Sequence, residues 1–225
     1  MELIDLAVER TTAATDLLLS VVAFAATVWL ARRPGDAFRR GLWCAIFGLL
    51  ALAAGLGAVA HGLQMPETTR WMLWQPLFLS LGWSVGLFVV AVVLDVKGRA
   101  AALRALPIIL FLGLAFYGMT VWLGGHFGIF LVYQGVALLT ALVAYSVLLL
   151  RRRLAGSRWL VAGITLILIA STVQATEALR FTFVWPFDHN GIFHLLLLPA
   201  VVFLVLGVEA ALRAEAAGEP AEVAS

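Results

Sequence analysis

The sequence predicts an all-α protein, a bundle of seven transmembrane helices that form one membrane domain. Hydrophobic residues make up 63% of the 225-residue chain and charged residues only 12%. A chain of this composition cannot supply the polar surface that a soluble globular protein needs. Seven apolar runs are each about 20 residues long, which is the length that crosses a bilayer as a helix. No alternation of apolar and polar residues indicates the strands of a membrane barrel.

The seven runs follow one another with short connections, so consecutive helices should pack antiparallel. We expect these helices over residues 12–31, 41–63, 72–95, 102–123, 127–150, 159–179 and 191–212. Residues 1–213 then form a single seven-helix domain, and residues 214–225 form a polar tail that we expect to be disordered. Gly82 and Gly86 form a GxxxG pair in the third run, and such small residues let helix backbones approach closely.

The basic residues between the runs predict how the bundle sits in the membrane. Three alternate connections hold eleven of them: Arg32, Arg33, Arg39, Arg40, Lys97, Arg99, Arg104, Arg151, Arg152, Arg153 and Arg158. The opposite connections and the N-terminal segment hold only Arg10, Arg70 and Arg180. Because loops rich in Lys and Arg stay in the cytoplasm, we expect the N-terminus outside and the C-terminus inside. The expected location is a bacterial inner membrane.

Residue counts exclude several classes of protein. The single cysteine, Cys44, excludes an intrachain disulfide and a cysteine-based metal site. The single lysine, Lys97, lies in a predicted loop, so the chain lacks the buried helical lysine that a retinal protein uses. The basic residues form no continuous stripe, and we therefore expect no nucleic-acid partner. The sequence does not indicate an oligomeric state.

Polar side chains gather at the predicted outer ends of the helices. The set comprises His61, His126, His189, His194, Asp16, Thr15, Gln75, Tyr133, Gln134, Gln174 and Glu177. An ionisable group inside a membrane helix costs roughly 2.5–3.5 kcal/mol on insertion scales, so such groups usually face the bundle interior and have a partner. The set therefore predicts a polar pocket that opens to the outside.

The histidines of this pocket suit a metal ion. Imidazole is the commonest biological metal ligand, and a catalytic zinc uses three protein ligands and a water. His61 and His194 come from different helices at similar depths, so we expect the second and seventh helices to be neighbours. The candidates for the third ligand are His189, Asp188, Glu177 and Asp16.

Of these candidates, His189 has the most suitable chemistry, although its spacing is unusual. It precedes His194 by five residues, about 140° around an ideal helix. His189 can still converge on the site if a non-helical segment holds it before the helix begins. Asn190 lies four residues before His194, and we expect it to cap the helix or to hydrogen-bond a ligand.

This pattern resembles the CREST superfamily of seven-helix membrane hydrolases, which includes the alkaline ceramidases and the progestin and adipoQ receptors. His61 at the end of the second helix and His189-Asn-Gly-Ile-Phe-His194 at the start of the seventh carry the resemblance. The second motif is also similar to that of an uncharacterised bacterial seven-helix family. The resemblance implies that three histidines hold zinc. Gly57 and Gln75 stand where the superfamily has a serine and an aspartate.

These features together predict a zinc-dependent membrane hydrolase that acts on a lipid amide or ester. The bound metal would activate a water, and Glu177, Asp188 or Asp16 would serve as the base. The amide side chains expected to support the ligands are Asn190, Gln75 and Gln174. A membrane lipid is the expected substrate.

Two other functions fit the same pocket. One is a receptor-like protein that binds a lipid or small molecule without turnover. The other is a haem-b protein in which His61 and His194 are the axial ligands on facing helices.

Overall fold

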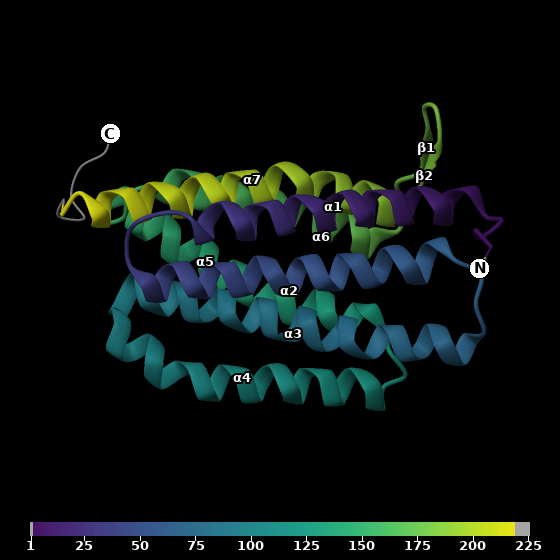
Figure 1. The fold of residues 1–225 in the computed structure, drawn as a ribbon, viewed down its shortest axis with the longest axis horizontal. Coiled ribbons are helices and arrows are strands. Elements are labelled where there is room, and N and C mark those ends of the chain that lie inside the picture. The colour runs from purple at the N-terminus through teal and green to yellow at the C-terminus, as the bar shows by residue number, and fades with distance from the viewer. Residues whose placement is uncertain (1, 219–225) are drawn as a thin grey trace.

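The computed structural model describes residues 2–218, and helices make up nearly all of that part of the chain (Figure 1). The helices are α1 (Ala7–Ala31), α2 (Ala37–Gly62), α3 (Glu67–Lys97), α4 (Arg99–Trp122), α5 (Phe127–Leu150), α6 (Ser157–Thr176) and α7 (His189–Ala216). Each of these seven is long and apolar enough to cross a membrane. The predicted all-α seven-helix fold is confirmed, and it indicates an integral membrane protein.

The helices lie side by side with their axes roughly aligned (Figure 1), and α1 lies between α2 and α7. It packs along both α2 and α7, which touch each other only slightly. The expectation that the second and seventh helices are direct neighbours is therefore wrong, because the first helix lies between them. α3 packs against α2, α4 and α5, and α6 fills the space between α5 and α7.

Most helices begin several residues before their long apolar runs, because polar side chains cap them or form their first turns. Asp36 caps α2 by accepting a hydrogen bond from the Arg39 backbone N–H at 2.7 Å. Asp188 caps α7 in the same way, accepting from the Gly191 N–H at 3.0 Å. The cap of α7 is thus Asp188 rather than Asn190. A side-chain oxygen at this position accepts a hydrogen bond from an otherwise unpaired N–H group of the first turn.

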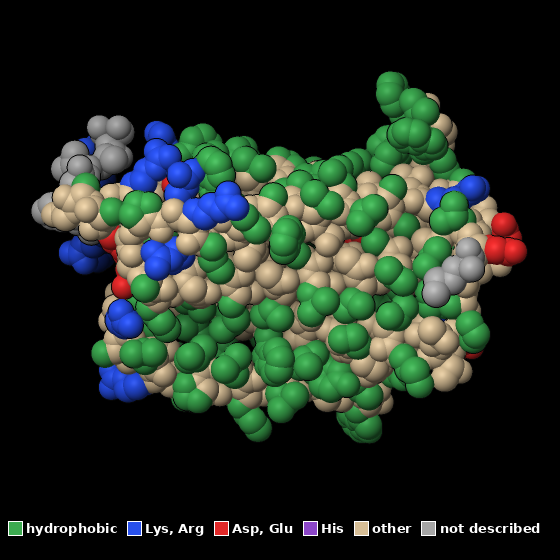
Figure 2. All heavy atoms as spheres, in the orientation of Figure 1, with side chains coloured by type: hydrophobic (Ala, Val, Ile, Leu, Met, Phe, Trp, Pro, Cys, Tyr) green, Lys and Arg blue, Asp and Glu red, His purple; other side chains and the backbone are tan. Residues whose placement is uncertain are grey.

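Basic side chains gather at one end of the bundle, which we call the arginine-rich end (Figure 2). Some of them are buried there in ion pairs. Arg39 of α2 pairs with Asp95 of α3 and, at 2.9 Å, with Glu215 of α7. Tyr145 of α5 donates a hydrogen bond of 2.8 Å to Asp95. This network joins four helices. The prediction that Arg39 lies in a loop is therefore wrong, because Arg39 is in the first turn of α2.

α1 begins and α7 ends at opposite ends of the bundle, and the end where α1 begins is called the N-terminal end here (Figure 1). α7 continues to Ala216, so the first residues of the predicted tail are helical. Residues 219–225 of that tail lie outside the described residues. A short hairpin of β1 (Phe181–Thr182) and β2 (Pro186–Phe187) joins α6 to α7, which the sequence reading did not predict.

Candidate functional site

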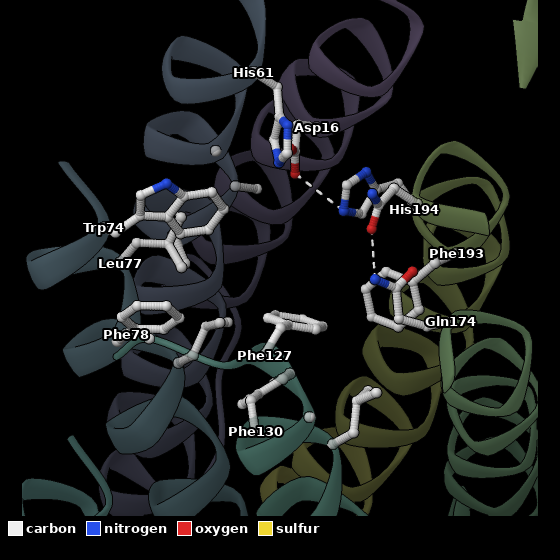
Figure 3. A pocket seen from close by; sticks show the side chains of 18 of the residues that line it. Asp16, His61, Trp74, Leu77, Phe78, Phe127, Phe130, Gln174, Phe193 and His194 are labelled. Carbon is white, nitrogen blue, oxygen red and sulfur yellow. Dashed lines mark hydrogen bonds and ion pairs between the residues drawn. The ribbon is translucent and has the colours of Figure 1, made fainter. Parts of the chain in front are cut away.

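A cavity of about 1040 Å³ lies in the half of the bundle nearest the N-terminal end. Six helices line it, namely α1, α2, α3, α5, α6 and α7, together with the glycine turn before α5. Its volume is at the upper end of the roughly 300–1,000 Å³ typical of small-molecule pockets. Figure 3 shows the side chains arranged around this open space.

One side of the cavity is an aromatic wall, built mainly by α3 and α5 (Figure 3). Trp74 and Phe78 stack on each other in α3, with ring centroids 5.6 Å apart. Phe127 and Phe130 of α5 pack together at 5.1 Å. Rings one turn apart on a helix share a face, so each pair presents a broad apolar surface to the cavity.

The other side carries a pair of ionisable groups on α1 and α7. Asp16 Oδ1 lies 3.3 Å from Nε2 of His194 (Figure 3). Both side chains are largely buried, with 7% and 13% of their surface exposed. The pair forms because α1 packs along α7, which places the two residues at the same depth. A buried charge needs such a partner to be tolerated inside a bundle.

Both ring nitrogens of His194 have polar neighbours. The Thr15 hydroxyl donates to the Thr12 carbonyl at 2.9 Å and lies 3.3 Å from Nδ1 of His194. Nε2 of His194 faces the Asp16 carboxyl group. An imidazole and a carboxyl group, which can each give or take a proton, thus lie together at the cavity wall.

Gly57 explains how Asp16 fits in this place. A Cβ atom built on Gly57 of α2 would lie only 2.7 Å from Oδ2 of Asp16. The carboxyl group thus occupies the space that any larger residue at position 57 would fill. The serine that the resemblance would place here is replaced by glycine, and α1 supplies a carboxyl group to the same region.

His61 of α2 has a partner that the sequence reading missed. Its Nδ1 lies 2.6 Å from Oε2 of Glu9, and its ring meets Trp74 edge to face at 5.5 Å. Glu9 precedes Asp16 by seven residues, so the two lie on one face of α1 two turns apart. That spacing was visible in the sequence and could have identified Glu9.

A second polar group is formed by α6 and the first turn of α7. Gln174 donates from its Nε2 to Oδ1 of Asn190 at 2.5 Å. The Oε1 atom of Gln174 and the Nδ1 atom of His189 are both buried and have no hydrogen-bond partner among the described residues. Both residues line the cavity. His189 is the first residue of α7, so the expected non-helical position for it is wrong.

Comparison with known proteins places this chain in a family. A family model matches residues 11–213, which include nearly all of the bundle and most of the cavity lining. The chain belongs to the DUF6962 family. This is a family of unknown function. No curated protein and no solved structure matches the chain.

The remaining site candidates of this DUF6962 protein lie at the edge of the cavity or outside it. Glu177 is exposed at the end of α6, where it also lines the cavity. Asp188 caps α7 and accepts a hydrogen bond from the Thr12 hydroxyl at 3.4 Å. Gln75 accepts a hydrogen bond from the Tyr117 hydroxyl at 3.2 Å and does not line the cavity. Among the three candidate bases, Asp16 is the one buried beside a cavity histidine.

The three histidines predicted to bind zinc, His61, His189 and His194, all line the cavity. Within residues 2–218, however, no three His, Cys, Asp or Glu side chains are grouped closely enough to hold a metal ion. His61 and His194 instead face the carboxyl groups of Glu9 and Asp16. The donor set of this DUF6962 protein, as arranged, does not fit a three-ligand zinc site, and zinc binding stays a prediction.

Proposed function

We propose that this protein binds an amphipathic ligand, a lipid or a lipid-like small molecule, in the cavity near the N-terminal end. The observation that carries the proposal is the division of the cavity into the aromatic wall and a polar wall formed by Asp16, Gln174, His189, Asn190 and His194. An apolar chain would lie against Trp74, Phe78, Phe127 and Phe130. The polar head would lie beside His194 and Gln174. Ligand sites are typically of this kind, mostly apolar with a few convergent polar groups.

The unpartnered atoms of the polar wall restrict the chemistry of the head group. A buried polar atom without a hydrogen bond costs about 1–3 kcal/mol. Within the described residues 2–218, Oε1 of Gln174 is an acceptor that lacks a donor, and Nδ1 of His189 also lacks a partner. A hydroxyl, amine or amide N–H on the ligand would satisfy Gln174. A ligand that only accepts hydrogen bonds would leave it unpaired, so we expect a head group that donates.

The cavity would face the outer leaflet if the bundle is oriented as its basic residues predict. The arginine-rich end would then lie at the cytoplasmic surface, and α1 would begin outside. We propose this orientation, in a bacterial inner membrane, for the working protein. The ligand would then be drawn from the outer leaflet or from the medium, at the depth of the lipid head groups.

Hydrolysis of a lipid amide or ester is the second candidate, and the Asp16–His194 pair is the observation that favours it. A base must lie within reach of the proton that it removes, and this pair places a carboxyl group and an imidazole together at the cavity wall. The resemblance to the CREST hydrolases points to the same activity. The haem alternative receives no such support, because Thr15 and Asp16 contact both ring nitrogens of His194.

The proposal is tested by identifying what the protein carries out of the membrane. We expect native mass spectrometry of the detergent-purified protein to show one bound amphipathic molecule per chain. Gln174→Leu keeps the side-chain size but removes its polar atoms, and we expect it to lose most of this ligand. Thr172→Val is the matched control, because Thr172 lies on the same helix, is exposed and donates its hydroxyl proton to the Leu168 carbonyl.

Two outcomes decide between the candidates. A protein that carries no bound molecule and gains no thermal stability from a membrane lipid extract would contradict ligand binding. Release of a fatty acid from an amide or ester lipid, lost in Asp16→Asn, would show that the cavity supports hydrolysis. Binding without release would identify a receptor-like or carrier protein.

A further inference from the structure

We infer that the hairpin between α6 and α7 inserts its tip into the lipid head-group region beside the bundle. We call residues 181–187 (Phe-Thr-Phe-Val-Trp-Pro-Phe) the aromatic arm; the segment contains no charged residue. This interaction surface does not depend on what the cavity binds. It rests on how the base of the arm is held, on what the tip exposes and on where the arm lies.

The base of the aromatic arm is fixed to the bundle. β1 pairs with β2 in antiparallel register, and Phe181 stacks on Phe187 with ring centroids 5.0 Å apart. Phe187 packs close to Gly191 of α7, where an added Cβ would lie 3.2 Å from its ring. β2 also contacts α1. The arm is therefore attached to two helices at its base rather than being a loose loop.

The tip of the aromatic arm is largely uncovered by the rest of residues 2–218. Phe183 is 87% exposed, Val184 66% and Trp185 64%. A soluble protein rarely leaves three large apolar side chains together in water, since such a patch marks a contact surface. Exposure of these three side chains to water is unfavourable. We therefore expect something apolar outside the bundle to cover the tip.

The position of the arm identifies lipid as that cover. Figure 1 shows the hairpin leaving the bundle sideways, across the helix axes, near the N-terminal end. Figure 2 shows the same feature as an apolar projection beside the apolar flank of the helices. Because it lies beside the helices and not beyond their ends, its tip would be at the level of the lipid head groups.

The side chains of the arm suit that level of the bilayer. Tryptophan prefers the membrane–water interface, where its ring is in the apolar region and its N–H meets water. Arg180 and Asp188 flank the arm at its base, where lipid phosphates and water are available to charged groups. Glu177 and His189, at the two ends of the same connection, line the cavity. An inserted arm would therefore hold the cavity rim at a defined depth.

The test is simple to set up because the chain has a single native cysteine, Cys44, and its removal leaves an introduced cysteine as the one site for a label. In a Cys44→Ser background, Val184→Cys or Phe183→Cys is labelled with a polarity-sensitive fluorophore and the full chain is placed in phosphatidylcholine vesicles. Gln64→Cys is the control, because Gln64 is exposed in the α2–α3 connection at the same end of the bundle. Quenching by a nitroxide lipid labelled near the head group is compared with quenching by aqueous iodide.

We expect labels at 183 and 184 to be quenched several-fold more strongly by the nitroxide lipid than the label at 64, and less strongly by iodide. Labels at both tip positions that respond to iodide as the control does would overturn the inference. Protection from both quenchers, with energy transfer between labelled copies, would also overturn it and show that the tip contacts a second copy of the chain. Two tip positions are used so that one disturbed variant does not decide the result.

Discussion

Replacing Gly57 by alanine tests the packing on which the polar wall depends. A Cβ atom at position 57 would lie 2.7 Å from Oδ2 and 3.1 Å from Cγ of Asp16. The carboxyl group is short, buried and paired with His194, so it cannot move aside without losing that partner. We expect Gly57→Ala to displace Asp16 and to separate the pair.

The change in the free energy of unfolding caused by Gly57→Ala is the sum of two opposing effects. Adding a methyl group to a filled site typically costs about 1–3 kcal/mol, whereas replacing glycine by alanine inside a helix gains about 1 kcal/mol. Gly48→Ala on the same helix isolates the gain, because the nearest atom to its new Cβ would be Thr27 Oγ1 at 4.0 Å. We therefore expect Gly57→Ala to be about 1–3 kcal/mol less stable than Gly48→Ala.

Unfolding of the purified protein in mixed detergent micelles measures this difference, and native mass spectrometry on the same samples measures bound ligand. We expect Gly57→Ala alone to lose ligand. In an Asp16→Ala background the penalty of Gly57→Ala should vanish, since the atom with which it collides is gone. Equal stability of Gly57→Ala and Gly48→Ala, with ligand retained in both, would refute the packing argument.

Three further predictions concern the rest of the bundle. Arg39→Ala should destabilise the protein by about 3–5 kcal/mol because it leaves Asp95 buried without its partner; a loss in thermal melting no larger than that of the exposed Arg32→Ala would contradict this. Elemental analysis should find sub-stoichiometric zinc, because residues 2–218 bring no three His, Cys, Asp or Glu side chains together; a full equivalent that His194→Ala removes would restore the zinc hypothesis. Reporter fusions within the α3–α4 and α5–α6 connections should both read cytoplasmic, and external readings at both would reverse the proposed orientation.

The seven helices could be predicted because length and composition decide whether a segment crosses a membrane. Their neighbours could not, since an apolar face looks the same whichever helix covers it. For this reason the sequence reading placed the second helix beside the seventh and missed α1 between them. The burial of Arg39 could not be predicted for the same reason. Its partner Asp95 is on another helix, and the residues around Arg39 in the sequence do not indicate that the two meet.

The polar wall was predicted in part. His194, Asp16 and Gln174 could be predicted because a polar group inside an apolar run is costly and usually faces a partner in the bundle interior. Glu9 lies just before the long apolar run, and its match to Asp16 at seven residues was overlooked. Two acceptable caps, Asp188 and Asn190, stand two residues apart, and only the backbone shows that α7 begins after the first. The aromatic arm has the alternating residues of a strand but is too short to be distinguished from a loop.

We propose that an amphipathic ligand occupies the cavity with its head group at the polar wall. An experimental density map of the protein, purified in mild detergent without added ligand, would show that ligand. We expect elongated density along the aromatic wall that ends within hydrogen-bonding distance of Oε1 of Gln174 and near the Asp16–His194 pair. A well-resolved cavity that contains only water, or is closed by inward movement of Phe127 and Trp74, would contradict it.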